Sequence, residues 1–423
     1  MKHNRIAAIT MGLTLAIVSA GALSGRAPAS PAKPAKKDSA HPSRTPVHLT
    51  GIIQIPGNPL TSSDIVWLDA TTKRFYFSER ANFAVDVVDV DKGVFLGRVT
   101  GFAGANAQTP PPPNGQGPNG VFVAGKQLWA GDGNSTLRVA DVDPASPNYL
   151  KIVHSIDTSL PECDAPGSHH CDRVDEIGYD PADRITLASN NQPNSPVAPF
   201  GRVDPYATFV DAKTFQVLGH VAFPGATGIE QPLWIPALRR FFLTVVGYNN
   251  GGGSNHGFGE IAVINPKTMM VEKNYAPGDC RTSGEVLGPD NRLLVSCGRP
   301  VILNALTGEV ENRIMQIGGG DEVWYNPGDD LFYVVAGDTS KPPVPSLGLI
   351  DAKTGMWLQN VANPGGRQAA GLPSNNHIFT PVLVTAAQVA NPDSDRTACA
   401  QFGVQGHGCI AVFAHEDAHQ DAH

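Results

Sequence analysis

The sequence predicts an all-β fold, a seven-bladed β-propeller closed by an N-terminal strand that joins the last blade. Three observations predict it. A motif of an acidic pair, a strand, a tight turn and a second strand, clearest from Arg173 to Asn191, returns along the chain. A strand ending in Asp or Asn before an Asp-x-x-Thr/Gly turn also recurs. Finally, 45 Gly and 36 Pro without a convincing amphipathic helix indicate many short strands joined by turns.

The two motifs together define the length of one unit. Copies of the first motif begin at Ser63, Glu230 and Asp321, and a degenerate copy begins at Gly284. The turn motif is separated from its next copy by 52, 70, 54, 39 and 47 residues. These spacings match a four-stranded blade with variable loops. The Asp or Asn of the turn is found at Asp89, Asp141, Asp211, Asn265, Asn304 and Asp351.

The two ends of the folded part supply the seventh unit. The C-terminal remainder contains three strand-like stretches, 368–372, 376–384 and 409–414, and no fourth. The N-terminal remainder contains one, 47–56. We expect the N-terminal strand to complete the last blade, because ring closure removes the exposed edges of an open sheet.

The Asp-Ala-Lys-Thr-Gly turn at 351–355, after a Val/Ile-rich strand, resembles the YVTN-type repeat of bacterial seven-bladed propellers. The resemblance covers nearly all of residues 47–414, and it implies the fold more than a function. The chain departs from a minimal repeat array by long insertions, which are residues 103–117, 157–172, 192–205, 247–258 and 385–408.

The remaining segments predict export. Residues 1–26 combine Lys2 and Arg5 with an apolar run and small residues, which is typical of a secretory signal peptide. Residues 27–46 are a Pro/Ala/Lys linker expected to be disordered, and residues 415–423 a His-rich disordered tail. No later apolar run is long enough for a membrane-spanning helix. We therefore expect a periplasmic or secreted monomer whose propeller occupies residues 47–414.

The charge balance argues against nucleic acid as a partner. Without residues 1–46 the net charge is −14, where the full chain has −8, and phosphate binding requires the opposite sign.

Six cysteines group by proximity into Cys163 with Cys171, Cys280 with Cys297, and Cys399 with Cys409. Local pairs in an exported chain predict three disulfides. This pairing is one of the fifteen connectivities that six cysteines allow. Metal ligation by the cysteines is the alternative, but no Cys-x-x-Cys spacing supports it.

Oxygen-bearing side chains begin the predicted inner strands of six blades, where we expect the mouth of the central channel. They are Asp64, Asn119, Asp175 with Glu176, Glu230, Glu285, and Asp321 with Glu322. So many facing carboxylates require a cation or shared protons. Ca²⁺ or another divalent cation is one solution, bound by Asn119, Glu176, Glu230, Glu285 and Glu322, with Asp175 or Asp321 as general base. Alternatively, several of these acids bond backbone N–H groups of neighbouring blades or face solvent.

This arrangement is similar in residue type and placement to the gluconolactonase-like calcium-dependent lactonase propellers. The similarity implies a metal-dependent hydrolase of a lactone or ester.

His169 and His170 precede the acid pair. His170 is a candidate general acid or base or a metal ligand; alternatively, it is an exposed histidine of the loop. The tail sequence His415-Glu-Asp-Ala-His419 matches a zinc-protease pattern but lacks the helix that the pattern needs.

Two function classes remain open from the sequence. The first is the metal-dependent hydrolase, acting on a small-molecule substrate at the channel mouth. The second is a non-catalytic exported propeller that binds a protein, polymer or small ligand. Fold alone cannot choose between them. A quinoprotein dehydrogenase is disfavoured, because the repeats lack a regular tryptophan motif and the chain has five Trp.

Overall fold

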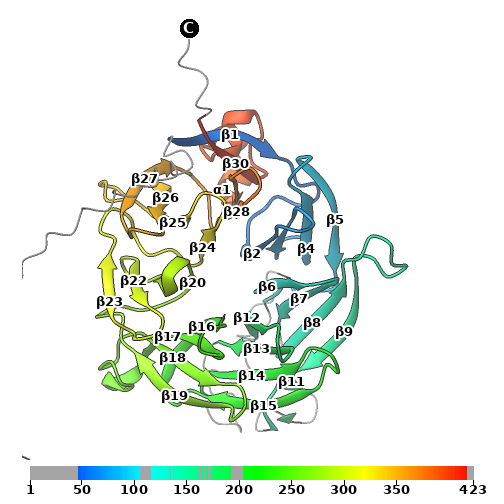
Figure 1. The fold of residues 1–423 in the computed structure, drawn as a ribbon. Helices are drawn as coiled ribbons and strands as arrows, with labels where there is room; N and C mark the ends of the chain where they lie inside the picture. Colours follow the sequence, from blue (N-terminus) through cyan, green and yellow to red (C-terminus); the bar gives the residue numbers. More distant parts are fainter. Residues whose placement is uncertain are drawn as a thin grey trace, which may run out of the picture. The chain divides into compact units, whose positions relative to one another are not determined.

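The computed structural model describes residues 46–104, 116–133, 135–161, 173–191 and 203–416, with the backbone of β10 (Asp164–Ala165) and β11 (Ser168–His169). Seven four-stranded antiparallel sheets form a ring, which confirms the seven-bladed propeller (Figure 1). The predicted signal peptide, most of the linker, the Cys163–Cys171 pair, His170 and residues 417–423 lie outside the described residues. Among the described residues, no helix has the length and apolarity needed to cross a membrane.

Each blade is numbered in chain order, from its inner to its outer strand. Blades 1 to 3 are β2 (Ser63–Asp69), β3 (Arg74–Glu79), β4 (Ala84–Asp89) and β5 (Val94–Thr100); β6 (Val121–Ala124), β7 (Gln127–Asp132), β8 (Thr136–Asp141) and β9 (Lys151–Asp157); and β12 (Val174–Asp180), β13 (Ile185–Asn190), β14 (Tyr206–Asp211) and β15 (Val217–Ala222).

The next three blades follow the same order. They are β16 (Ala226–Ile235), β17 (Arg240–Tyr248), β18 (Glu260–Asn265) and β19 (Met270–Tyr275); β20 (Glu285–Leu287), β21 (Arg292–Val295), β22 (Val301–Asn304) and β23 (Val310–Arg313); and β24 (Val323–Asn326), β25 (Leu331–Gly337), β26 (Pro345–Asp351) and β27 (Trp357–Ala362). The inner strands line the centre of the ring (Figure 1).

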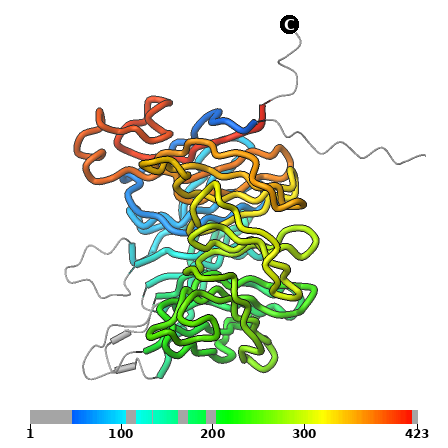
Figure 2. The backbone as a smooth tube through the Cα atoms, turned by 90° about the vertical axis from the view of Figure 1, so that its left-hand side faces the viewer, coloured from blue at the N-terminus to red at the C-terminus, as the bar shows by residue number. Residues whose placement is uncertain are grey.

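Blade 7 closes the ring as the sequence predicts. Its strands are β28 (Ala370–Leu372), β29 (His377–Val382), β30 (Cys409–His415) and, outermost, β1 (Val47–Ile53). Strand β1 pairs with β30 from Val47 opposite His415 to Ile53 opposite Ile410. Figure 2 shows both described ends, in blue and red, at the same edge of the ring. Pairing β1 with β30 covers an edge that would otherwise present unpaired backbone groups.

The recurrent turn has a local cause that the sequence shows directly. The carboxylate of Asp351 accepts hydrogen bonds from the backbone N–H groups of Lys353 and Thr354, at 3.0 and 2.8 Å. In most copies the residue four positions after the Asp or Asn has positive φ, as Gly355 does. Glycine takes this conformation without strain. The same bonding pattern starts at Asp211 and Asn304.

The apolar core lies between neighbouring blades. Phe75 and Phe77 of blade 1 pack with Ala370 and Phe379 of blade 7, and all four are buried. Similar clusters join blades 4 with 5 and blades 6 with 7. Each blade therefore stabilises its neighbours, and the ring as a whole holds the inner strands in register.

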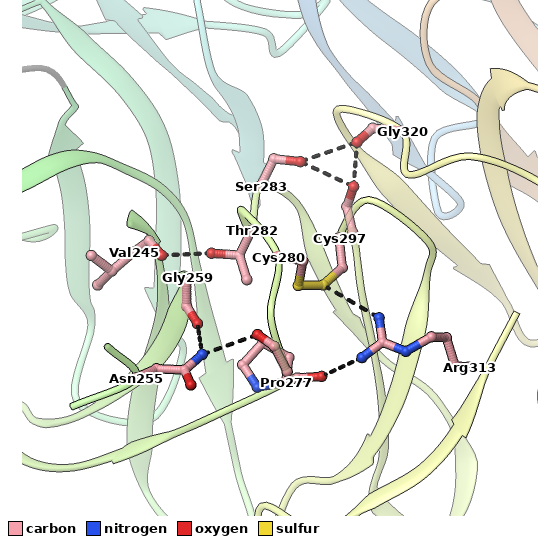
Figure 3. Close-up of a disulfide and its surroundings, with 12 residues drawn as sticks. Val245, Asn255, Gly259, Pro277, Cys280, Thr282, Ser283, Cys297, Arg313 and Gly320 are labelled. Carbon is pink, nitrogen blue, oxygen red and sulfur yellow. Dashed lines mark hydrogen bonds between the residues drawn. A yellow bond between two sulfur atoms is a disulfide. The ribbon is translucent and has the colours of Figure 1, made fainter. Parts of the chain in front are cut away.

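Two of the three predicted disulfides are confirmed. Cys280 pairs with Cys297, with 5.6 Å between their Cα atoms, and Cys399 pairs with Cys409 at 5.8 Å. The second bond ties the insertion that contains α1 (Ala386–Ala390) to the start of β30. Beside the first, Arg313 donates to the carbonyl oxygen of Pro277 at 2.8 Å (Figure 3).

Gly284 provides a direct test of how closely the inner strands approach. Its N–H donates to the Asp321 carbonyl oxygen of the next blade at 2.7 Å, and an added Cβ would lie 2.6 Å from that oxygen and 2.8 Å from the Glu322 Cα. We expect Gly284→Ala to lower the free energy of unfolding by about 1–3 kcal/mol, measured by denaturant titration. Gly51→Ala is the control, because open space surrounds its added Cβ. Equal stability of the two variants would contradict this packing.

Candidate functional site

Irregular starts of the inner strands present carboxyl groups at the channel mouth. In β12, one extra residue lies between Val174 and Ile177 relative to β13, and this bulge contains Asp175 and Glu176. Strand β2 has the same irregularity at Asp64. A bulge redirects a side chain that the regular strand alternation would place elsewhere. The bulges therefore determine the direction of these acidic side chains, which sequence position alone does not give.

Two further blades contribute in the same way. Glu230 lies in a third bulge, where β16 has one more residue than β17 between Ile229 and Pro232. Asp321 and Glu322 directly precede β24. Electrostatic interactions connect Asp64, Asp175, Glu230 and the Asp321–Glu322 pair, so the ring brings acids from four blades into one site.

Arginines are interleaved with these acids, which the sequence analysis did not anticipate. Arg80 follows β3 and is 7% exposed. Its Nη2 contacts the Asp64 carboxylate and donates to Asn119 Oδ1 at 2.6 Å. Arg173 donates to Asp175 at 2.9 Å. The positive charge of Arg367 opposes the rise in the pKa of Asp321 that desolvation and Asp175 cause. A search for basic residues at strand ends near the mouth would have found all three.

Asn119 forms its side-chain hydrogen bonds within the protein. Its carbonyl oxygen accepts from Arg80, and its Nδ2 donates to the Val174 carbonyl oxygen at 2.7 Å and to that of Gln116 at 2.9 Å. These bonds connect blades 1, 2 and 3. The oxygen predicted to be a metal ligand is therefore already paired with a guanidinium group.

Glu176 and Glu322 form a buried acid pair at the mouth. Their side chains are hydrogen-bonded to each other, and they are 4% and 8% exposed. Burial raises the pKa of Glu322 to about 8, with further contributions from Asp321 and Asp64. Burial and the Glu322 charge raise the pKa of Glu176 well above its usual value. Ionisation of both of these buried, neighbouring carboxyl groups is unfavourable, so we expect them to share a proton.

The surrounding acids also hold their protons more tightly than usual. Burial raises the pKa of Asp64 to about 7, although Arg80 opposes the shift. Burial and the neighbouring Asp175 and Asp321 raise the pKa of Glu230 well above its usual value. Desolvation by the surrounding protein and the charge of Asp175 raise the pKa of Asp321, while nearby arginines oppose the shift.

Glu285 is not brought together with the other acids. The backbone of Gly284 forms the same two hydrogen bonds as that of Gly120. The carbonyl oxygen accepts from the second strand of the same blade, and the N–H donates to a carbonyl oxygen of the next blade. Glu285 therefore corresponds to Val121, whose side chain lies in the interblade core. Glu285 is fully buried, burial alone raises its pKa, and its carboxyl oxygens lack hydrogen-bond partners among the described residues.

A serine precedes this glycine in blade 5. The Ser283 hydroxyl donates to the carbonyl oxygen of Gly320 at 3.0 Å (Figure 3). By the same equivalence of Gly284 with Gly120, Ser283 corresponds to Asn119. Blade 5 therefore sends a hydroxyl group where the sequence pattern predicted a carboxylate.

A small, partly open cavity of about 40 Å³ lies next to the buried acid pair. Glu176, Glu322, Gln231, Trp67 and Trp324 are among its lining residues. The two indole rings are 5.7 Å apart between centroids and nearly perpendicular. Glu322 directly precedes β24 and Trp324 lies in that strand, and both line the cavity. The channel is thus acidic at its mouth and aromatic farther in.

The five predicted metal ligands do not form one convergent set, since Asn119 is paired with Arg80 and Glu285 lies apart. In the described part of the chain, no three His, Cys, Asp or Glu side chains are grouped so that they could hold a metal ion. Asp175, one predicted base, is bonded to Arg173, whereas Asp321, the other, is solvent-exposed.

Comparison with known proteins leaves the subtype open. The chain matches no protein-family model, and no curated protein sequence matches it. The resemblances to YVTN-type and gluconolactonase-like propellers therefore stay predictions, whereas the seven-bladed fold stands on the arrangement of the sheets.

Replacing Arg80 tests the charge balance of the mouth. We expect Arg80→Met to lower the free energy of unfolding by about 2–3 kcal/mol, because Asp64 and Asn119 lose a buried partner. Arg239→Met is the matched control. Arg239 pairs with Asp183 at 3.0 Å, but these side chains are 58% and 41% exposed, so the loss should stay below about 1 kcal/mol. Similar losses in chemical denaturation would contradict the account.

The buried carboxyl pair predicts an unusual pH dependence of stability. A carboxyl whose pKa is raised on folding binds its proton more tightly in the folded state, so the free energy of unfolding falls as pH rises from about 4.5 to about 8. We expect Glu322→Gln to flatten this fall, measured by urea titration across that range. Glu272→Gln, which removes an exposed partner of Arg240, should leave the slope unchanged. An unaltered slope in Glu322→Gln would refute the shifted pKa.

Proposed function

We propose that the protein is an exported propeller that binds a small cationic ligand at the acidic mouth of its channel. The observation that carries the proposal is the gathering of six carboxyl groups around three arginines. The carboxyl groups are Asp64, Asp175, Glu176, Glu230, Asp321 and Glu322, and the arginines are Arg80, Arg173 and Arg367.

This excess of acid explains the raised pKa values without a bound ligand. The arginines offset Asp64, Asp175 and Asp321, and Arg173 also partly offsets Glu230, whereas no arginine is among the main electrostatic influences on the Glu176–Glu322 pair. These groups keep protons because burial and mutual repulsion oppose ionisation. An entering cation supplies the missing positive charge and displaces those protons, so the site favours cations over anions.

Export is supported by two independent features. The N-terminal segment has the pattern of a signal peptide. Disulfides such as Cys280–Cys297 and Cys399–Cys409 persist in oxidising compartments. Both favour the periplasm or the extracellular space as the place where the site meets its ligand.

A hydrolase of a lactone or ester is the second candidate. The pKa of Glu322, about 8, is in the range where a carboxyl group can act as general acid or base near neutral pH. Of the metal ligands predicted from the sequence, Glu176, Glu230 and Glu322 belong to this site, whereas Asn119 is paired with Arg80 and Glu285 lies apart.

Ligand titration distinguishes charge-selective binding from a purely structural acid cluster. After dialysis against a chelator, calorimetry with CaCl₂, putrescine, glycerol and sodium acetate should show heat for a cation only. The double variant Glu230→Gln/Asp321→Asn should weaken that binding at least about tenfold, since two of the site's anionic groups are lost. The control, Asp183→Asn, alters an exposed acid on blade 3 and should bind as the unaltered protein does. Binding of acetate but no cation, or equal affinity in the double variant, would overturn the proposal.

The same dialysed protein tests the second candidate. Lactones and aryl esters are screened with and without added Ca²⁺, and any activity is compared in Glu322→Gln. A hydrolase that uses this carboxyl loses at least about 100-fold in rate. Turnover that Glu322→Gln leaves intact would exclude Glu322 as the acid or base.

A further inference from the structure

We propose that the small cavity lined by the Glu176–Glu322 pair and the two tryptophans binds a primary ammonium group. The inference rests on the proposed cation-binding function and specifies its ligand class as an alkylamine. The ammonium head enters the cavity, and its carbon chain leads back to the mouth.

Among the described residues, the protein supplies no hydrogen-bond donor to two oxygen atoms of the acid pair. Apart from each other, Glu176 Oε2 and Glu322 Oε1 find no hydrogen-bond partner among the described residues, and both side chains are more than nine-tenths buried. Both carboxyls line the cavity. Two acceptors satisfy each other only through a shared proton or through a donor from outside. An –NH₃⁺ group offers three donors and can bridge both.

The aromatic part of the cavity lining favours an organic cation over a metal ion. Trp67 and Trp324 line the same cavity and provide no coordinating oxygen. Ca²⁺ requires six to eight oxygen ligands, and the described residues contain no group of three acids or histidines arranged for a metal. Indole rings instead attract ammonium groups through their π-electrons and accommodate the adjoining carbon atoms.

The size of the cavity limits what can enter. A water molecule needs about 10–15 Å³ of cavity space, so a cavity of about 40 Å³ has room for an ammonium or methylammonium head. Glu176 and Glu322 directly follow Asp175 and Asp321 in the chain. A longer alkylamine would therefore extend toward these two residues at the mouth.

Methylammonium chloride is the probe that tests this inference in the full chain, measured by calorimetry at neutral pH. Tetramethylammonium has the same charge but no N–H donor, and KCl controls for ionic strength. We expect methylammonium to bind and tetramethylammonium not to bind. Glu322→Gln and Trp324→Leu should each weaken methylammonium at least about tenfold, whereas Trp324→Phe keeps an aromatic wall and most of the affinity. Trp357→Phe, on an outer strand, should change nothing.

Distinct outcomes separate this inference from the proposed function. If cations bind and the Glu230→Gln/Asp321→Asn variant loses them, but Trp324→Leu and Glu322→Gln retain full affinity, the mouth binds cations and the cavity proposal is wrong. Tetramethylammonium binding as tightly as methylammonium would also overturn it. If no cation binds the full chain at all, the proposed function fails together with this inference. Thermal unfolding of each variant verifies that a loss of binding is not a loss of folding.

Discussion

Repulsion between buried carboxyl groups on one axis is the constraint on which the candidate site depends. A propeller gathers residues that are far apart in the chain, such as Asp64 and Asp321, at the start of its inner strands. Carboxylates in a low-dielectric site cannot remain charged without compensation. The protein compensates in two ways, with arginines that pair with the outer acids and with a proton shared by Glu176 and Glu322.

Interblade packing is what makes this concentration of acids possible. Gly284 and Gly120 bring neighbouring inner strands into backbone contact, and the apolar clusters between blades hold that contact along the whole ring. The hydrophobic core therefore stabilises an arrangement that would be unfavourable by electrostatics alone. Function-bearing groups are often held in this way, at a local cost to stability.

The fold could be predicted because its signals are local and repeated. Asp351 and the positive φ of Gly355 fix one turn, and the same chemistry recurs in other blades. Even the closure by β1 followed from counting strands at both ends. The site was harder to predict, because the extra residue of a β-bulge shifts the alternation of side chains between the two faces of the sheet by one position. Glu285 appeared equivalent to Glu176 in sequence, yet its strand places it in the position of a core residue. Arg80 and Arg173 were overlooked because only acids were sought at the mouth.

Infrared spectroscopy of the carboxyl groups tests the central claim most directly. A protonated carboxyl group has a C=O stretching band that a carboxylate lacks, so the shared proton is visible without any ligand. The account predicts such a band at neutral pH in the unaltered protein, and a clear loss of its intensity in Glu322→Gln. Spectra with carboxylate bands alone, identical in both proteins, would contradict a shared proton between Glu176 and Glu322.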